Sequence, residues 1–399
     1  MPFSQPHPAR EVFRVFLRLG LTSFGGPIAH LGYFREEFVV RRGWLDDARY
    51  AQLLAVCQSL PGPASSQMGF AIGLLRAGWR GALAAFVGFT LPSVLLMLAF
   101  AGFAPWLQHG MGLALLHGLK LVAVCVVAYG LWGMARQMTP DLPRLLLAAA
   151  ACALVLVSGT AWAQLLAIAL GALTGRWLCR HVAAQPPAAF AVHYGRRLAA
   201  LATVAFVAAL ALALLWPSGE PSAPAMTAAF YRAGALVFGG GHVVLPLLQQ
   251  SLVDTGWIGS DTFLAGYGAA QALPGPMFSI AAFLGAEVPT GLPRMLAAGL
   301  AVLALFLPGF LLLTAALPVW QRLTAWQGAA PVLAGINASV VGLLAAAWYD
   351  PVLIQGVHRW SDVAIVAIGL VMLARLRQAA LWTVAWCATA SVVAHLITQ

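Results

Sequence analysis

The sequence has 399 residues, of which 61% are hydrophobic and only 9% are charged. Its mean hydropathy of +0.87 lies far outside the range of soluble globular domains, so most of the chain is expected to lie in a lipid bilayer. The formal charge is +10, and the basic residues are dispersed between apolar spans. This pattern favours cytoplasmic loops beside lipid and excludes a nucleic-acid-binding surface.

Long apolar runs follow one another along the chain. Runs long enough to cross a bilayer occupy residues 80–104, 110–133, 198–216, 295–317 and 329–348, and shorter ones occupy residues 145–157, 162–178, 363–373 and 379–396. Their apolar character is continuous, whereas a membrane β-barrel needs alternating strands. The sequence therefore predicts an all-α polytopic membrane protein with roughly 10 to 13 membrane segments, some of them broken or re-entrant.

Three short motifs occur twice, at an offset of 213 or 214 positions, which predicts an internal repeat. The first copies are Phe24-Gly25-Gly26-Pro27, Gly43-Trp44 and Gln58-Ser59-Leu60-Pro61-Gly62-Pro63, and the second copies are Phe238-Gly239-Gly240-Gly241, Gly256-Trp257 and Gln271-Ala272-Leu273-Pro274-Gly275-Pro276. A Pro-rich stretch at residues 217–224 separates the copies. The predicted repeats are residues 1–217, with motifs at 23–63, and residues 218–399, with motifs at 238–276.

The charges of corresponding loops differ between the repeats. Residues 35–49 carry four arginines, whereas the counterpart at residues 249–262 has no Lys or Arg and two aspartates. The positive-inside rule places the first loop and the N-terminus in the cytoplasm and the second loop outside. We therefore expect two repeats of inverted topology, as in many secondary transporters.

Glycine and proline interrupt each repeat twice. Pro-Gly-Pro in an apolar helix removes backbone donors and clashes with the preceding turn, so the helix must break. Broken backbone at membrane depth is tolerated where protein buries it or where it lines an aqueous cavity. Four breaks in symmetric positions predict half-helix ends that converge near the midplane, where N-terminal amides attract anions. Ordinary kinks filled by small residues are the alternative.

The predicted substrate site consists of the residues at these breaks and nearby polar side chains. Gln58 and Gln271 precede the Pro-Gly-Pro motifs and could bind substrate or cap freed carbonyls. The chain's single lysine, Lys120, lies in an apolar run, where it could attract an anion or form an ion pair within the bundle; its repeat counterpart is Asn337. The full set is Gly25, Gly26, Pro27, Gln58, Pro61, Gly62, Pro63, Ser65, Ser66, Lys120, Gly239, Gly240, Gly241, Gln271, Pro274, Gly275, Pro276, Ser279 and Asn337.

Four titratable residues are candidates for proton coupling. His30 and His242 each follow a glycine motif and could titrate near neutral pH, although a packing histidine is the alternative for both. Glu36 and Glu37 lie among arginines, where a solvated charged face is the alternative. The sequence has no His-Glu-x-x-His, Walker or Gly-x-Ser-x-Gly motif. We therefore expect no enzyme activity, no cofactor and no metal site.

The motifs together resemble those of the long-chain chromate ion transporter family. The resemblance rests on Ser23-Phe24-Gly25-Gly26-Pro27, the two Pro-Gly-Pro motifs and the segment at residues 335–343, and it extends over the chain from about Glu11. It implies a carrier that exports chromate from the cytoplasm, coupled to the proton gradient, and confers chromate resistance. Sulfate, a dianion of nearly the same shape, is implied as a competitor.

Other functions stay open at this point. A carrier for sulfate or another tetrahedral oxyanion would use the same site. A passive anion channel would also suit broken helices and an intramembrane cation, and a membrane scaffold is disfavoured by the symmetric breaks. The expected partners are the chromate or sulfate dianion, protons and the lipid bilayer, with a homodimer as one possible assembly and no nucleic acid.

Overall fold

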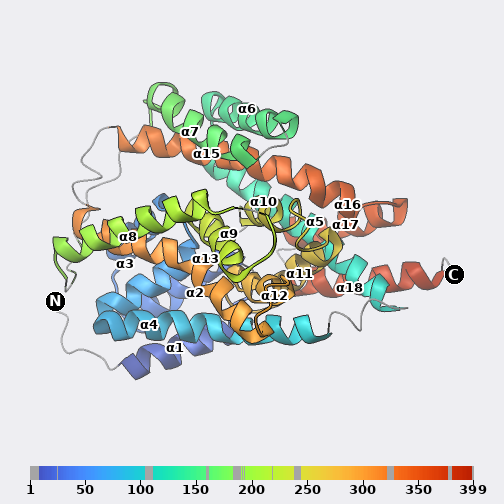
Figure 1. Cartoon of the computed structure of the whole chain (residues 1–399), viewed down its shortest axis with the longest axis horizontal. Helices are drawn as coiled ribbons and strands as arrows, with labels where there is room; N and C mark the ends of the chain where they lie inside the picture. The colour runs from blue at the N-terminus through green and yellow to red at the C-terminus, as the bar shows by residue number, and fades with distance from the viewer. Residues whose placement is uncertain are drawn as a thin grey trace. The chain divides into compact units, whose positions relative to one another are not determined.

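The computed structural model describes residues 9–24, 26–103, 111–158, 161–182, 190, 192, 194–217, 219–237, 244–320, 328–375 and 380–397. All regular structure within these ranges is helical, as Figure 1 shows. This confirms the predicted all-α fold. Some of the predicted site residues lie outside the described ranges, namely Gly25, Gly239, Gly240, Gly241 and His242. The side chain of Pro27 also lies outside them.

Five stretches of helix in the described ranges are long and apolar enough to cross a membrane, and they correspond to the five long predicted spans to within a residue wherever a span ends outside its helix. They are α4 (Ala64–Phe103), α5 (Met111–Met138), α8 (Arg196–Leu215), α13 (Arg294–Ala316) with its extension to Val319, and α15 (Ala329–Ala347) with its extension to Gly356. The shorter predicted runs correspond to α6 (Leu142–Ser158), α7 (Ala161–Leu178), α17 (Trp360–Ala374) and α18 (Ala380–Ile397). The chain is therefore a multi-pass membrane protein.

The helix α4 begins earlier than its predicted span. The predicted span starts at residue 80, whereas the helix already starts at Ala64, directly after the first Pro-Gly-Pro. A kink at Ala77 and Gly78, where the backbone leaves helical φ and ψ, separates its two parts. The predicted span matches the second part, and the first part begins after the Pro-Gly-Pro, where the sequence analysis expects the end of a half-helix.

The chain divides into two compact units. Unit 1 comprises residues 1–99, 187–241 and 273–322, and unit 2 comprises residues 100–186, 242–272 and 323–399. Each unit therefore takes segments from both sequence repeats. The second repeat's two breaks coincide with unit boundaries, since the chain leaves unit 1 after Gly241 and returns to it at Leu273.

Unit 1 contains the first repeat's paired short helices and the long proline-bearing helices of both repeats. It holds α8, α13 and α4 up to Ala99. It also holds α1 (Ala9–Thr22), α2 (Gly26–Arg35), η1 (Glu36–Arg41), α3 (Asp47–Ser59), α9 (Ala223–Leu236), η4 (Met277–Ser279) and α12 (Ile280–Glu287). The helix α13 packs against α8, α9 and α12. Unit 1 thus contains the three helix breaks for which the structure describes residues, at residues 25–27, 61–63 and 274–276.

Unit 2 is built around α5 and α15. It also holds α6, α7, α10 (Val244–Leu252), α11 (Ser260–Ala272), η6 (Trp348–Leu353), α16 (Ile354–Gly356), α17 and α18. The helix α15 packs on α6 and α7, where Gly335 lies against Gly171 and Gly175, and α5 packs on α11, α17 and α18. Small residues at these crossings let the backbones approach closely, the usual device of helix packing in lipid.

The repeat is visible in the backbone as well as in the motifs. Positive φ angles occur in pairs of glycines at equivalent positions, which are Gly43 and Gly256, Gly62 and Gly275, and Gly78 and Gly291. The packing repeats too, because a Cβ on Gly20 of α1 would meet the Phe89 carbonyl of α4, and one on Gly234 of α9 would meet the Leu305 carbonyl of α13. The two repeats therefore share local structure along much of their length.

Candidate functional site

Helices end at the predicted breaks. In the first repeat, α1 ends at Thr22 and α2 begins at Gly26, and α3 ends at Ser59 before α4 begins at Ala64. In the second repeat, α11 ends at Ala272 and η4 begins at Met277. The Gly-Pro motifs therefore break the helices where the sequence places them.

Two hydrogen bonds join the breaks of one repeat to those of the other. The amide of Gly62 donates to the Val237 carbonyl at 2.7 Å, and the amide of Gly275 donates to the Ser23 carbonyl at 2.9 Å. Gly62 and Gly275 are equivalent residues of the repeats, and so are Ser23 and Val237. This reciprocal exchange is the pattern of a two-fold relation, here between two halves of one chain.

Each Pro-Gly-Pro motif also packs against the proline-bearing helix of the other repeat. Gly62 approaches Gly309, next to Pro308 of α13, while Gly275 approaches Ser93, next to Pro92 of α4. The Gln67 amide nitrogen fixes the first contact by donating to Pro61 O at 2.8 Å and to Gly309 O at 3.0 Å. The freed carbonyls of the breaks thus find protein partners, as burial in lipid requires.

Several buried polar atoms around these breaks have no hydrogen-bond partner among the described residues. They are Ser23 Oγ, His30 Nδ1, Ser66 Oγ, Gln67 Oε1 and Thr90 Oγ1. A buried polar atom left unpaired costs roughly 1–3 kcal/mol, so such atoms mark a place where water or a ligand completes the bonding. All five lie in unit 1, and three of them are hydroxyls that can donate to an oxyanion.

His30 connects these atoms to the second Pro-Gly-Pro. Its Nε2 lies 3.2 Å from the Ser23 carbonyl, which also accepts from Gly275, and its ring packs edge-on against Phe89. If Nε2 carries the proton of the neutral ring, Nδ1 is an acceptor, and it becomes a donor when the ring is protonated. The fully buried His30 therefore presents a nitrogen whose role depends on its protonation.

Thr90 and Ser93 are candidate site residues that the sequence analysis missed. Both are buried, and the Ser93 hydroxyl donates to the Thr90 carbonyl at 3.0 Å. They flank Pro92 within the apolar run of α4, and paired hydroxyls beside a helix proline were the available signal.

The remaining predicted residues of the breaks differ in burial. Ser65 and Ser279 are buried close to the two Pro-Gly-Pro motifs, and Gln58 is half-buried at the end of α3. Gln271 is buried and hydrogen-bonds the Tyr267 hydroxyl on its own helix. Gln271 falls in unit 2, whereas the Pro-Gly-Pro that follows it falls in unit 1.

Lys120 forms an ion pair. Its Nζ lies 2.5 Å from Oδ1 of Asp261, whose side chain is 81% exposed, while the Lys120 side chain is 12% exposed. Lys120 and Asn337 both belong to unit 2, whereas the described breaks belong to unit 1. Their participation in a common site with the breaks therefore stays a prediction.

Glu37 lies in a charged cluster in η1, which directly follows α2. Its carboxylate accepts from Arg42 at 2.7 Å and from Arg41 at 3.3 Å, whereas Glu36 is exposed. Burial raises the pKa of Glu37, but hydrogen bonds and charge from Arg42 and Arg41 outweigh it and leave the pKa below its ordinary value. A carboxylate held ionised in this way favours the structural reading of Glu37 over proton transfer.

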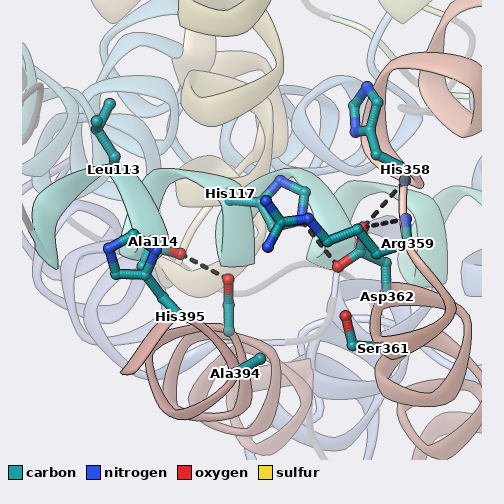
Figure 2. A pocket seen from close by; sticks show the side chains of 10 residues that line it. Leu113, Ala114, His117, His358, Arg359, Ser361, Asp362, Ala394 and His395 are labelled. Atoms are coloured by element: carbon teal, nitrogen blue, oxygen red, sulfur yellow. Dashed lines mark hydrogen bonds and ion pairs between the residues drawn. The ribbon is translucent and has the colours of Figure 1, made fainter. Parts of the chain in front are cut away.

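A histidine-lined pocket in unit 2 was not predicted from the sequence. Figure 2 shows His117 and Asp362 joined across it, with two further bonds from Asp362 to the backbone of His358 and Arg359. The pocket has a volume of about 240 Å³ and also includes His395 and Ser391. Because its one carboxylate is already used by three donors, the pocket offers donors to an anion. The overlooked signal was Asp362 directly before the apolar run at residues 363–373.

The sequence matches the chromate transporter family over residues 10–176 and again over residues 224–392. A "Probable chromate transport protein" of Synechococcus elongatus is 28% identical over 377 residues, which cover 92% of this chain and 90% of the relative. The chromate transport proteins of Pseudomonas aeruginosa and Cupriavidus metallidurans are also 28% identical, over 88% and 85% of this chain and 81% of each relative. No solved structure matches the chain significantly. Because the family covers both repeats and most of the sequence, the chain belongs to the chromate transporter family.

Proposed function

We propose that this protein is a secondary transporter that exports chromate from the cytoplasm across the bacterial inner membrane, coupled to the proton gradient, and so confers chromate resistance. The observation that carries the proposal is the group of unpartnered buried polar atoms beside helix breaks that the two repeats complete for each other. The names of the relatives point to chromate as the substrate.

The chemistry of this group suits a tetrahedral dianion. Ser23, Ser66 and Thr90 each bring a hydroxyl that lacks a partner among the described residues. The helices α2 and α4 begin at the breaks, and their first amides have no acceptor within the helix and carry partial positive charge. Hydroxyls and helix N-termini together can bind an oxyanion without a fixed positive side chain. Sulfate offers the same oxygens and is the expected competitor.

The direction of transport follows from the charge of the substrate. An inside-negative potential favours the exit of anions by roughly 2.3 kcal/mol per charge for each 100 mV, which is about twice as much for a dianion. Chromate export therefore gains from the membrane potential as well as from an antiported cation. The N-terminus is cytoplasmic in this proposal, as the arginine-rich loop at residues 35–49 requires.

Alternating access is proposed to arise from the two repeats, residues 1–217 and 218–399, in inverted orientation. The reciprocal hydrogen bonds support a two-fold relation, and the opposite charge of equivalent loops supports an axis in the membrane plane. Rocking about such an axis would expose one site to each side in turn. His30 is the proposed residue through which protonation changes the bonding at the breaks.

Chromate counterflow in proteoliposomes tests this function. Liposomes preloaded with unlabelled chromate should accumulate labelled chromate transiently, because a carrier exchanges substrate, whereas a passive channel gives steady current without saturation. Energised everted vesicles should accumulate chromate if the transport direction is export. Sulfate should compete; if its potency equals that of chromate, a dedicated chromate function is refuted.

The helix breaks are tested by Ser66→Ala and Thr90→Ala. Each removes a hydroxyl that lacks a partner, so each should raise the KM for chromate several-fold with little loss of folded protein. The matched control is Thr389→Ala, which removes a hydroxyl bonded within its own helix. Unchanged KM values in both test variants would show that the anion binds elsewhere.

A further inference from the structure

A second pocket in unit 2 has the opposite chemistry to the histidine-lined pocket. Its volume is about 290 Å³, and its charged lining residues are two carboxylates, Asp254 and Asp350, with no basic side chain among the described lining residues. Four glutamines complete the polar lining, namely Gln164, Gln249, Gln250 and Gln355. The pocket therefore offers many oxygen atoms and a net negative charge.

Gln164 is the residue that points to a ligand. It is only 5% exposed, on α7, and its Oε1 atom is buried without a hydrogen-bond partner in the described part of the chain. A buried amide oxygen without a partner can be satisfied by a hydrogen-bond donor or by a cation. The pocket that Gln164 lines supplies the space for one.

The local backbone brings the two carboxylates to this pocket. Asp350 lies in η6 at the end of α15, where its φ of −128° and ψ of 115° interrupt the helix. Asp254 follows α10 in the tight turn where its amide donates to Gln249 O. π-helical segments of this kind are frequent at functional sites. No ion pair to a basic residue is formed by either carboxylate within the described ranges.

The pKa of Asp254 is affected by the neighbouring carboxylate of Asp350. Burial, and then the negative charge of Asp350, raise the pKa of Asp254 above its ordinary value. Two carboxylates that repel each other bind a proton or another cation more readily than either would alone. The pocket is therefore suited to a cation and unsuited to chromate.

We propose that this acidic pocket, lined by Asp254, Asp350 and Gln164, binds the monovalent cation, a proton or Na⁺, whose gradient drives transport. The inference rests on the proposed function and assigns the driving ion to this pocket, so the proposed protonation of His30 changes the bonding at the breaks but does not bind the driving ion. Carboxylate and amide oxygens are suitable ligands for hard cations. Among the described residues, no group of three or more His, Cys, Asp or Glu side chains could hold a metal ion, which disfavours a transition metal at this pocket.

The pocket's expected position in the membrane agrees with this role. Asp254 belongs to the loop at residues 249–262, which the charge pattern places outside, and Gln164 follows the uncharged turn at residues 158–160. A cation that moves inward down its gradient would reach this pocket from the outer side.

The test compares two transport modes in proteoliposomes for Asp254→Asn, Asp350→Asn and Gln164→Leu. Accumulation of chromate driven by an imposed gradient needs the coupling ion, whereas counterflow needs the anion site alone. Gradient-driven accumulation should fall by roughly 5- to 150-fold, the usual range of coupling between sites, while counterflow stays within about twofold of the unmodified protein. Glu220→Gln, at an exposed carboxylate outside the pocket, is the control and should change neither mode.

Separate gradients identify the ion. A pH gradient and a Na⁺ gradient are imposed in turn, and the one that drives the unmodified protein should lose its effect in the variants. If gradient-driven accumulation is unchanged in the variants, or if accumulation and counterflow fall in the same proportion, the pocket is not the coupling site. Retained counterflow also shows that a variant is folded, and Asp254→Asn, at a position outside a helix, carries the test if Asp350→Asn does not fold.

A binding measurement keeps this inference separate from the proposed function. The thermal unfolding temperature of the purified protein is measured in NaCl, in choline chloride and over a range of pH. A cation-dependent rise that disappears in Asp254→Asn and Asp350→Asn supports the pocket even if counterflow shows that chromate is not the substrate. Equal shifts in the unmodified protein and both variants would overturn it.

Discussion

Substitution of Gly275 by alanine should destabilise the protein through both backbone strain and overlap. Gly275 has a φ of +96°, and a Cβ there would lie 2.9 Å from Ser93 Oγ, 3.1 Å from Ser93 Cβ and 3.2 Å from the Phe89 carbonyl. Alanine in the left-handed region costs roughly 1–2 kcal/mol. Overpacking of a filled site adds about 1–3 kcal/mol, so a total of about 2–5 kcal/mol is expected.

The matched control is Gly291→Ala. Gly291 has a φ of +76° but nothing within 4 Å of the added Cβ, so only the strain of roughly 1–2 kcal/mol should appear. Free energies of unfolding are compared in detergent micelles, and chromate counterflow is measured in parallel. If Gly275→Ala costs no more than Gly291→Ala, the close contact between the second Pro-Gly-Pro and α4 is wrong.

A second substitution isolates the contact itself. Ser93→Gly removes the two nearest atoms and should recover part of the loss in the double variant. Because glycine in a helix costs about 0.5–1 kcal/mol by itself, the recovery is read as the interaction term of a double-mutant cycle. An interaction term near zero would refute the reasoning, since the strain alone does not depend on Ser93.

Three further predictions concern other parts of the molecule. Ser66→Ala should weaken chromate transport while it leaves the free energy of unfolding unchanged or slightly higher, because it removes a buried hydroxyl without a partner; a loss of stability would mean that this hydroxyl is bonded. Asp261→Asn should change the free energy of unfolding by less than about 1 kcal/mol, because the Asp261 carboxylate that pairs with Lys120 is solvent-exposed; a larger loss would give the ion pair a structural role. The pKa of Glu37 is lowered from its ordinary value of 4.5, so its stabilising contribution is present above that pH and is lost as the pH falls through the lowered pKa. Thermal unfolding on acidification should therefore depend less on pH in Glu37→Gln than in the unmodified protein, and equal pH dependence in both would contradict this.

The spans and the breaks could be predicted because they depend on local chemistry. A run of about 20 apolar residues is typical of a helix that crosses the bilayer, and Pro-Gly-Pro cannot continue a helix. The equivalent motifs share more than sequence in the structure, since Gly62 and Gly275 both have a positive φ.

The contacts between the repeats could not be predicted in the same way. That Gly62 donates to Val237 depends on which segment of the other repeat approaches it, and the motif itself contains no such information. Thr90 and Ser93 were missed because hydroxyls in an apolar helix usually bond to their own backbone. The assignment of α10 and α11 to unit 2, away from the equivalent α2 and α3 of unit 1, likewise arises from packing across the whole chain.

The reciprocal bonds between the breaks have a consequence for biosynthesis. The ribosome delivers Gly62 to the membrane long before it delivers Val237, and Ser23 long before Gly275. An amide at a helix break in lipid is costly until its acceptor arrives, so the first repeat is inserted before it can reach its final form. A chain that stops after the first repeat should therefore be a substrate for membrane proteases. Each repeat therefore supplies hydrogen-bond partners that the other needs for its final form.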